Sequence, residues 1–310
     1  MTGSRNFERT PGLVQLARRQ HAVVNRAQLA GVGISARHVA SQLAARRWRA
    51  ATSDVVVLHT GPLPREAELW VAVLDAEPPV ALGSWTGLAK HGLRGWDREG
   101  THIVVPRGAK TRRLPGVVVH ESRRPAPEDI MRVDRLPVHT VQRCAVDAAA
   151  WQESPRTAVG LLAAVVQQRK ASPEQLWDQL ERVGQVRFRD LMRRSVADVR
   201  GGSDALSEID FVRLCRRNGL PEPKRQEHRI DARGRHRFLD AEWVLDDGRR
   251  LVVEIDGIGH MDASRWYDDL LRDAELDNGD GSIHLRLPAS AARTEPERVL
   301  AILTRHLRSP

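Results

Sequence analysis

Cysteine is nearly absent from this 310-residue sequence, which contains only Cys144 and Cys215. The two lie far apart and without C-x-x-C spacing, so the sequence indicates neither a disulfide framework nor a zinc site. The longest purely apolar run, residues 161–166, is far too short to cross a bilayer, and the first residues lack the apolar core of a signal peptide. We therefore expect a soluble protein of the reducing cytoplasm.

Lysine is also rare. Of the 49 basic residues only Lys90, Lys110, Lys170 and Lys224 are lysines, so arginine supplies almost all of the positive charge behind the net charge of +9. Arginine is the better residue for bidentate phosphate contacts, although a GC-rich genome produces the same bias. The balance favours a polyanionic partner. The sequence has no internal repeat, P-loop, Rossmann fingerprint or G-x-S-x-G elbow.

The positive charge is concentrated near the start of the chain. Residues 1–60 contain nine arginines against two acids, Glu8 and Asp54, which leaves a net charge of +7. Periodicity predicts helices over residues 12–20, 25–30 and 35–47, with Asn25 and Ser35 as N-caps. A Gly-containing turn of helix-turn-helix type joins the last two, and the β-prone run that follows at residues 53–59 suits a wing. The pattern is that of a winged helix.

The stretch from Leu13 to His38 resembles the N-terminal domain of AbiEi-type antitoxins. In such a domain the third helix enters the major groove of DNA, with its N-terminal residues near base edges. We predict that its polar face consists of Arg37, His38, Ser41 and Gln42, while Val39, Leu43 and Ala40 pack inward. Phosphate contacts are expected from Arg46, Arg47 and Arg49. The alternatives are a solvated charged face and a winged helix that binds protein.

Residues 61–198 carry fewer signals, and only residues 61 to about 130 resemble the middle portion of the same antitoxin-like proteins. We expect a helix at residues 64–76, strands at 102–105 and 116–120, and helices within 138–195, one of them capped by Ser172. Residues 195–203 are polar and favour a linker. His91 and His120 are expected to be structural rather than metal ligands, because no second ligand lies at useful spacing.

Two strand-like runs, residues 238–245 and 249–255, flank Asp246-Asp247-Gly248 and predict a β-hairpin with Gly at the position that needs a positive φ. A turn centred on Asp247 places Asp240 opposite Glu254 and Phe238 opposite Asp256. Alternation then gives one apolar face (Leu239, Ala241, Trp243, Leu251, Val253 and Ile255) and one acidic face (Asp240, Glu242, Glu254 and Asp256).

Directly opposed like charges destabilise a sheet, and a hard cation held by carboxylate oxygens is the usual remedy. The acidic face therefore favours a metal site at Asp240 and Glu254. The alternative is a solvated acidic face without a ligand.

From Gly202 to Leu307 the order of acids resembles the PD-(D/E)xK nuclease superfamily, in particular the branch of the very-short-patch-repair mismatch endonuclease. The resemblance implies that Asp240 and Glu254 bind Mg²⁺ (or Mn²⁺), that Glu208 supports them, and that Arg272 holds the scissile phosphate. Asp256 stands where the family has a lysine, so Asp256 or His260 would orient or deprotonate the attacking water. A solvated Glu208, surface ion pairs of Arg272, and a His260 that bonds backbone are the alternatives.

We therefore expect a multidomain α+β protein. Its parts are a winged helix (residues 1–60), an α/β and helical middle region (61–198), and a restriction-endonuclease-like mixed sheet flanked by helices (199–310). The expected function is DNA binding with metal-dependent phosphodiester hydrolysis. The alternatives are an antitoxin-like transcriptional regulator with a degenerate nuclease fold and a protein-binding adaptor with a toxin partner.

Overall fold

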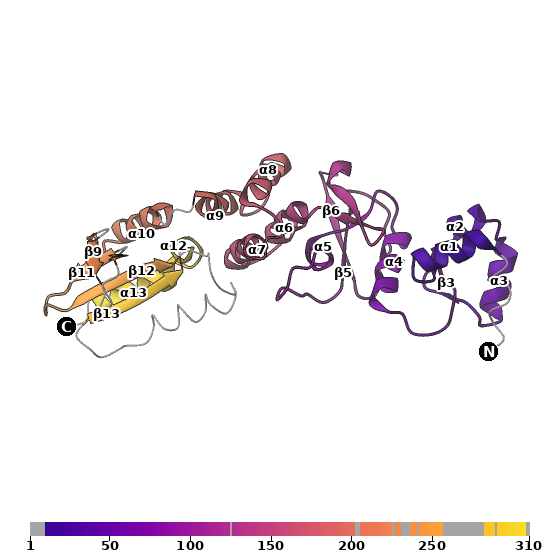
Figure 1. Ribbon diagram of the computed structural model, residues 1–310, viewed down its shortest axis with the longest axis horizontal. Helices are drawn as coiled ribbons and strands as arrows, with labels where there is room; N and C mark the ends of the chain where they lie inside the picture. Colours follow the sequence, from indigo (N-terminus) through magenta and orange to yellow (C-terminus); the bar gives the residue numbers. More distant parts are fainter. Residues whose placement is uncertain are drawn as a thin grey trace. The chain divides into compact units, whose positions relative to one another are not determined.

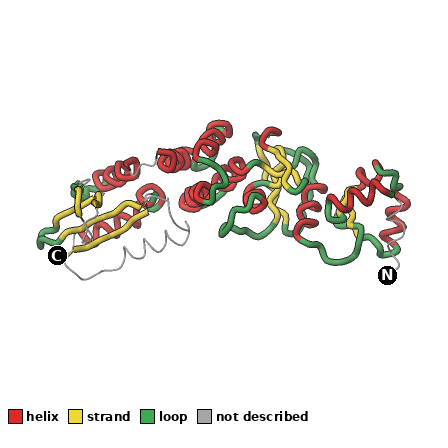
Figure 2. Tube along the Cα trace, viewed as in Figure 1, coloured by secondary structure: helices red, strands yellow, loops and turns green. Residues whose placement is uncertain are grey.

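The computed structural model describes residues 10–124, 126–201, 205–224, 227–230, 236–239, 241–256, 282–288 and 290–307. The chain divides into two compact units, Met1–Asp147 and Ala148–Pro310. Within the described residues there are twelve α-helices, one 3-10 helix and four β-sheets, which makes the protein α+β, as expected (Figures 1 and 2). No helix in this part of the chain is long and apolar enough to cross a membrane.

The first unit begins with three helices and a small antiparallel sheet of order β1-β3-β2. The elements are α1 (Pro11–Arg19), β1 (Val23–Asn25), α2 (Arg26–Gly31), α3 (Ala36–Ala44), β2 (Arg49–Ala50) and β3 (Val55–Val57). The three predicted helices are confirmed, as are the caps: Asn25 forms a capping box with Gln28, and Ser35 accepts from the N–H of His38. One core joins these elements, with Leu13, Val24, Leu29, Val39, Trp48 and Val56 all buried.

Helix α3 ends three residues earlier than predicted. Arg46 takes a positive φ of 51°, and the backbone N–H groups of Arg47 and Trp48 both donate to the carbonyl of Gln42. Trp48 is only 7% exposed and belongs to the N-terminal core. Burying this large indole requires the chain to turn back after Ala44, which local periodicity does not reveal.

A five-stranded mixed sheet of order β6-β5-β4-β8-β7 follows. Its elements are α4 (Arg65–Asp75), β4 (Ala81–Leu82), α5 (Ser84–Lys90), β5 (Thr101–Pro106), β6 (Val117–Ser122), η1 (Pro127–Asp129), β7 (Ile130–Val133), β8 (Leu136–His139) and α6 (Val141–Ala150). Strands β5 and β6 are parallel, as are β4 and β8. Ile103, Val105 and Val138 share one core with α4, whereas Val104 and His139 line a small cavity with Arg143 of α6.

Close approach of α5 to α6 depends on Gly87. A Cβ at this position would lie 2.3 Å from Cys144 Sγ. We expect Gly87→Ala to lower the free energy of unfolding by about 1–3 kcal/mol, because the two helices must separate. Urea denaturation measures this effect. Gly31→Ala is the matched control, since nothing lies within 4 Å of its Cβ position. If Gly87→Ala lowers the free energy of unfolding by the same amount in a Cys144→Ala background, which lacks the sulfur, the clash with Cys144 is not the cause.

The second unit starts with the helices α7 (Pro155–Gln167), α8 (Pro173–Val183) and α9 (Arg189–Gly201). Ser172 caps α8 in a capping box with Gln175, as predicted. The predicted linker over residues 195–203 is wrong for 195–201, which continue α9; residues 202–204 lie outside the described residues. Two polar residues there are packed rather than solvated: Ser195 is 5% exposed, and Asp198 forms an ion pair with Arg293, whose side chain is 7% exposed.

The rest of this unit comprises α10 (Ala205–Arg217), β9 (Glu227–Ile230), β10 (His236–Leu239), β11 (Ala241–Val244), β12 (Arg250–Asp256), β13 (Ser282–Pro288), α12 (Ala291–Thr294) and α13 (Pro296–Leu307). Strands β11, β12 and β13 form a mixed sheet in which β12 and β13 run parallel. Apolar residues of this sheet share a core with α10, α12 and α13, including Phe211, Trp243, Val253, Leu285 and Leu303.

Candidate functional site

Helix α3 presents an exposed polar surface that begins at its capped end. Arg37 and Ser41 are exposed and His38 is half-buried, while Val39 is buried in the N-terminal core. Ala40 is exposed, so its predicted inward position is wrong. The side of α3 that faces solvent therefore carries Arg37 and Ser41, two of the four residues predicted to lie near base edges.

Gln42 does not lie on this exposed surface, contrary to the prediction. Its side chain is 5% exposed. Its Oε1 accepts a hydrogen bond from Arg47 Nε at 2.6 Å, and its Nε2 lies 3.2 Å from Nε2 of the His38 ring. The His38 ring in turn meets Trp48 edge-on. Gln42 thus holds the end of α3 against the chain that follows, and a buried amide with satisfied hydrogen bonds is structural.

The arginines of α3 and of the segment after it differ in whether their guanidinium groups already have hydrogen-bond partners. Arg46 and Arg47 are exposed, and Arg49 is half-buried in β2, opposite Val57. Arg47 is engaged with Gln42, whereas Arg37 and Arg46 make no side-chain hydrogen bond or ion pair with any described residue. Exposed cations without partners retain all their donors for phosphate oxygens.

The second candidate site is the β11–β12 hairpin. Its register is as predicted, with Ala241 opposite Val253 and Trp243 opposite Leu251, and Gly248 in the turn has a φ of +83°. The predicted apolar face is also confirmed from residue 241 onward, because each of its described members, Ala241, Trp243, Leu251, Val253 and Ile255, is at most 5% exposed.

The first strand of the predicted hairpin is shorter than expected. Phe238 lies in β10, which pairs with β9 in a separate two-stranded sheet, so Phe238 is opposite His228 and not Asp256. Asp240 itself lies outside the described residues. Residues 236–239 pair with β9 instead, a partner that the hairpin pattern alone does not reveal.

The predicted acidic face is not uniformly open to solvent. Glu242 is 3% exposed, and its Oε1 lies 3.4 Å from Arg250 Nη1. Val252 on the same face is also buried. The Glu254 side chain is 39% exposed. Its Oε2 lies 3.3 Å from Nε of Arg286 on the neighbouring strand β13. Arginine therefore neutralises both described glutamates.

Carboxylate oxygens are the ligands that Mg²⁺ prefers, and Glu254 is the only member of the expected pair whose side chain the structure describes. Glu208 lies in α10 and Asp256 ends β12, but their side chains are outside the described part of the chain, as are Asp240, His260 and Arg272 altogether. Among the residues described, no three His, Cys, Asp or Glu side chains group in a way that could hold a metal ion.

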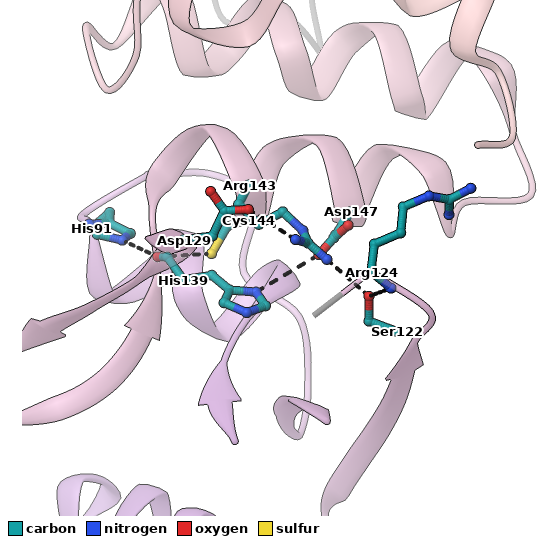
Figure 3. A network of polar contacts seen from close by, with 8 residues as sticks. All are labelled: His91, Ser122, Arg124, Asp129, His139, Arg143, Cys144 and Asp147. Carbon is teal, nitrogen blue, oxygen red and sulfur yellow. Dashed lines mark hydrogen bonds and ion pairs between the residues drawn. The ribbon is translucent and has the colours of Figure 1, made fainter. Parts of the chain in front are cut away.

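A buried polar network that sequence reasoning missed joins α6 to the five-stranded sheet (Figure 3). Arg143 is 2% exposed and donates three hydrogen bonds: from Nε to Asp147 (2.7 Å), from Nη1 to Asp129 (3.0 Å) and from Nη2 to Ser122 Oγ (3.0 Å). The available signal was the i,i+4 spacing of Arg143 and Asp147 inside a mostly apolar helix.

Burial controls the protonation of this network. It raises the pKa of Asp147 to about 6, and together with repulsion from Arg143 it lowers the pKa of His139 to about 4. Burial also raises the pKa of the Cys144 thiol. The interior thus favours an uncharged imidazole and an uncharged thiol.

Cys144, His139 and Asp147 are the residue types of a nucleophilic triad, but their geometry does not fit one. Cys144 is fully buried, and its Sγ donates to the backbone carbonyl of His139 at 3.4 Å rather than to the imidazole (Figure 3). A reactive cysteine needs solvent access and a base within hydrogen-bond reach. The network therefore stabilises the fold.

The structure supplies partners for both histidines that were predicted to be structural. The His91 ring donates from Nε2 to the carbonyl of His139 at 2.8 Å. His120 Nε2 lies 2.9 Å from His102 Nδ1, and burial lowers the pKa of His120 to about 4. Parallel pairing of β5 with β6 brings this second histidine close, although the two are 18 residues apart in the chain.

No known family model matches this chain, and no curated protein matches it. The choice among functions therefore depends on the chemistry and placement of the residues described above.

Proposed function

We propose that this chain is a DNA-binding protein whose residues 10–58 form a winged helix. The observation that carries the proposal is the exposed surface at α3 and just after it, where Arg37 in the helix and Arg46 in the following turn lie without partners among the described residues. The element order also supports the proposal. It runs helix, strand, helix, helix and then two strands, and the strands form a sheet of order β1-β3-β2. In a winged helix the third helix occupies the major groove, while flanking arginines contact phosphates.

The experiment that tests DNA binding is fluorescence anisotropy of the full chain with a labelled duplex over a range of salt concentrations. We expect Arg37→Ala/Arg46→Ala to weaken binding and to reduce the slope of log K against log salt by about 0.9 for each phosphate that is no longer neutralised. Arg132→Ala on the edge strand β7 removes an exposed charge elsewhere and should leave binding unchanged. A wild-type chain that binds no duplex at low salt would contradict the proposal.

We further propose metal-dependent hydrolysis of phosphodiester bonds at the hairpin, with Asp240 and Glu254 as ligands for Mg²⁺ or Mn²⁺. The register of β11 and β12 supports this function, because it matches the predicted hairpin as far as Ala241 opposite Val253. The ion would polarise the phosphate and lower the pKa of a bound water. Asp256 or His260 would orient that water, Glu208 would support the ligands, and Arg272 would hold the phosphate.

One observation favours a second candidate, an antitoxin-like transcriptional regulator with a degenerate nuclease fold. Arg286 already neutralises Glu254 at 3.3 Å, and a carboxylate paired with arginine has less need of a cation. In that case the C-terminal part would serve as a binding module, with a toxin protein as a candidate partner. DNA binding that survives chelation without any cleavage would select the regulator.

A further inference from the structure

The loop between β5 and β6 is strongly basic. Residues 107–116 include Arg107, Lys110, Arg112 and Arg113 and contain no acid. Three of these cations, Arg107, Lys110 and Arg113, are exposed and make no side-chain hydrogen bond or ion pair with any described residue. No described side chain therefore neutralises these three cations.

Arg112 fixes the loop beside the turn between β2 and β3. Its Nη2 lies 2.6 Å from Asp54 in that turn, and its Nη1 donates to Asp75 at 3.0 Å. The Asp75 side chain is only 2% exposed, so this end of the bridge is buried. The other end reaches the turn that would form the wing of the proposed winged helix.

The ion pair between Arg112 and Asp54 neutralises the negative charge of the turn that would form the wing. Asp54 is the only acid among residues 10–60, and an unpaired carboxylate at a turn facing DNA would repel phosphate. Arg112 neutralises it and brings Lys110 alongside. Lys110 and Arg112 line a cavity of about 410 Å³ together with Arg26 and Asp54. The other acids of that cavity are Asp75, which is paired with Arg112, and Glu77.

We propose that the β5–β6 loop is a second DNA-contacting element, in which Lys110 and Arg113 bind backbone phosphates beside the wing. The proposal rests on the DNA binding proposed above and extends it beyond residue 60. Residues 107–116 belong to no helix or strand, and we assign their cations to the DNA backbone, where contacts carry no sequence information. Arg112 is a positioning residue that acts through Asp54 and Asp75.

Salt-dependent anisotropy with the full chain and a labelled duplex of random sequence tests this assignment. Each phosphate that is no longer neutralised reduces the slope of log K against log salt by about 0.9, so Lys110→Ala/Arg113→Ala should reduce it by about 1.8. Arg132→Ala, on β7 at the opposite edge of the same sheet from β6, serves as the control and should match the wild type. Both loop residues are exposed, so the variants should fold normally, which circular dichroism checks.

A second measurement tests the neutralisation of Asp54. Asp54→Asn should retain or strengthen binding, and it should weaken the effect of Arg112→Gln on affinity, since the acid to be neutralised is gone. If the wild type binds DNA but the Lys110→Ala/Arg113→Ala variant keeps its salt slope, this inference is overturned and the proposed function stands. If the wild type binds no DNA, both are overturned.

Discussion

Replacing Arg143 with methionine is expected to lower the free energy of unfolding by about 3–5 kcal/mol, the usual cost of removing one partner from a buried ion pair. Arg143 donates hydrogen bonds to both Asp129 and Asp147, and both of these ion pairs lie in the interior. Without the guanidinium, two carboxylates remain in a medium that solvates charge poorly. Chemical denaturation of the full chain measures the effect.

The effect should depend on pH. Burial raises the pKa of Asp147 to about 6, above its unfolded value of 3.8, so the folded state holds this proton more tightly than the unfolded state. The stability contributed by this group is fully present below pH 3.8 and is lost as pH rises through about 6. Removing Arg143 takes away a nearby positive charge and raises this pKa further. The variant should therefore be most impaired above pH 6 and partly recover in acid.

Two controls separate this explanation from a simple packing defect. Arg132→Met, at an exposed position, should change stability by no more than about 0.5 kcal/mol. Adding Asp147→Asn to Arg143→Met removes one of the orphaned carboxylates and should recover part of the stability. If the double variant is as unstable as Arg143→Met at every pH, unpaired charge is not the cause.

Replacing Glu254 with glutamine is expected to abolish DNA cleavage that depends on Mg²⁺ or Mn²⁺. The amide keeps the shape of the side chain and removes the charge that would attract the ion under the proposed function. In metal sites generally, replacing a residue that only supports a ligand reduces activity by about 10–100-fold. Replacing a ligand itself is therefore expected to reduce activity by more than about 100-fold. Plasmid nicking by wild type, Glu254→Gln and Asp240→Asn, with and without a chelator, measures the effect.

Asp246→Asn is the matched control because Asp246 is an exposed carboxylate in the turn of the same hairpin. It should cut as fast as the wild type. Cleavage by Glu254→Gln at the wild-type rate would place the active site elsewhere. Failure of the wild type to cut any form of DNA with either metal would contradict hydrolysis and favour the regulator.

Predictions from the sequence succeeded where local chemistry dictates structure. Asn25, Ser35 and Ser172 cap helices because their side chains accept from backbone N–H groups three residues ahead. Gly248 sets the hairpin register because it adopts the positive φ that the turn requires. These interactions span a few residues, so the sequence contains all the information they need.

Predictions failed where distant residues decide the outcome. Gln42 has the polarity of a surface residue. It is nevertheless buried, because the chain turns back after α3 and Trp48 packs into the core. Residues 195–201 have the composition of a linker, yet Arg293 pairs with Asp198 and holds that segment as a packed helix. In each case the decisive partner lies outside the segment whose pattern was interpreted.

The sequence by itself determined the α+β class, the capped helices, the hairpin register and the concentration of arginine near the start of the chain. Only the tertiary structure showed that Arg143 unites Ser122, Asp129 and Asp147, that Arg286 faces Glu254, and that Arg112 joins the β5–β6 loop to Asp54. The reason is physical: capping and turn formation are short-range, whereas the partner of a charged side chain is set by strand order and helix packing, which bring together residues far apart in the chain.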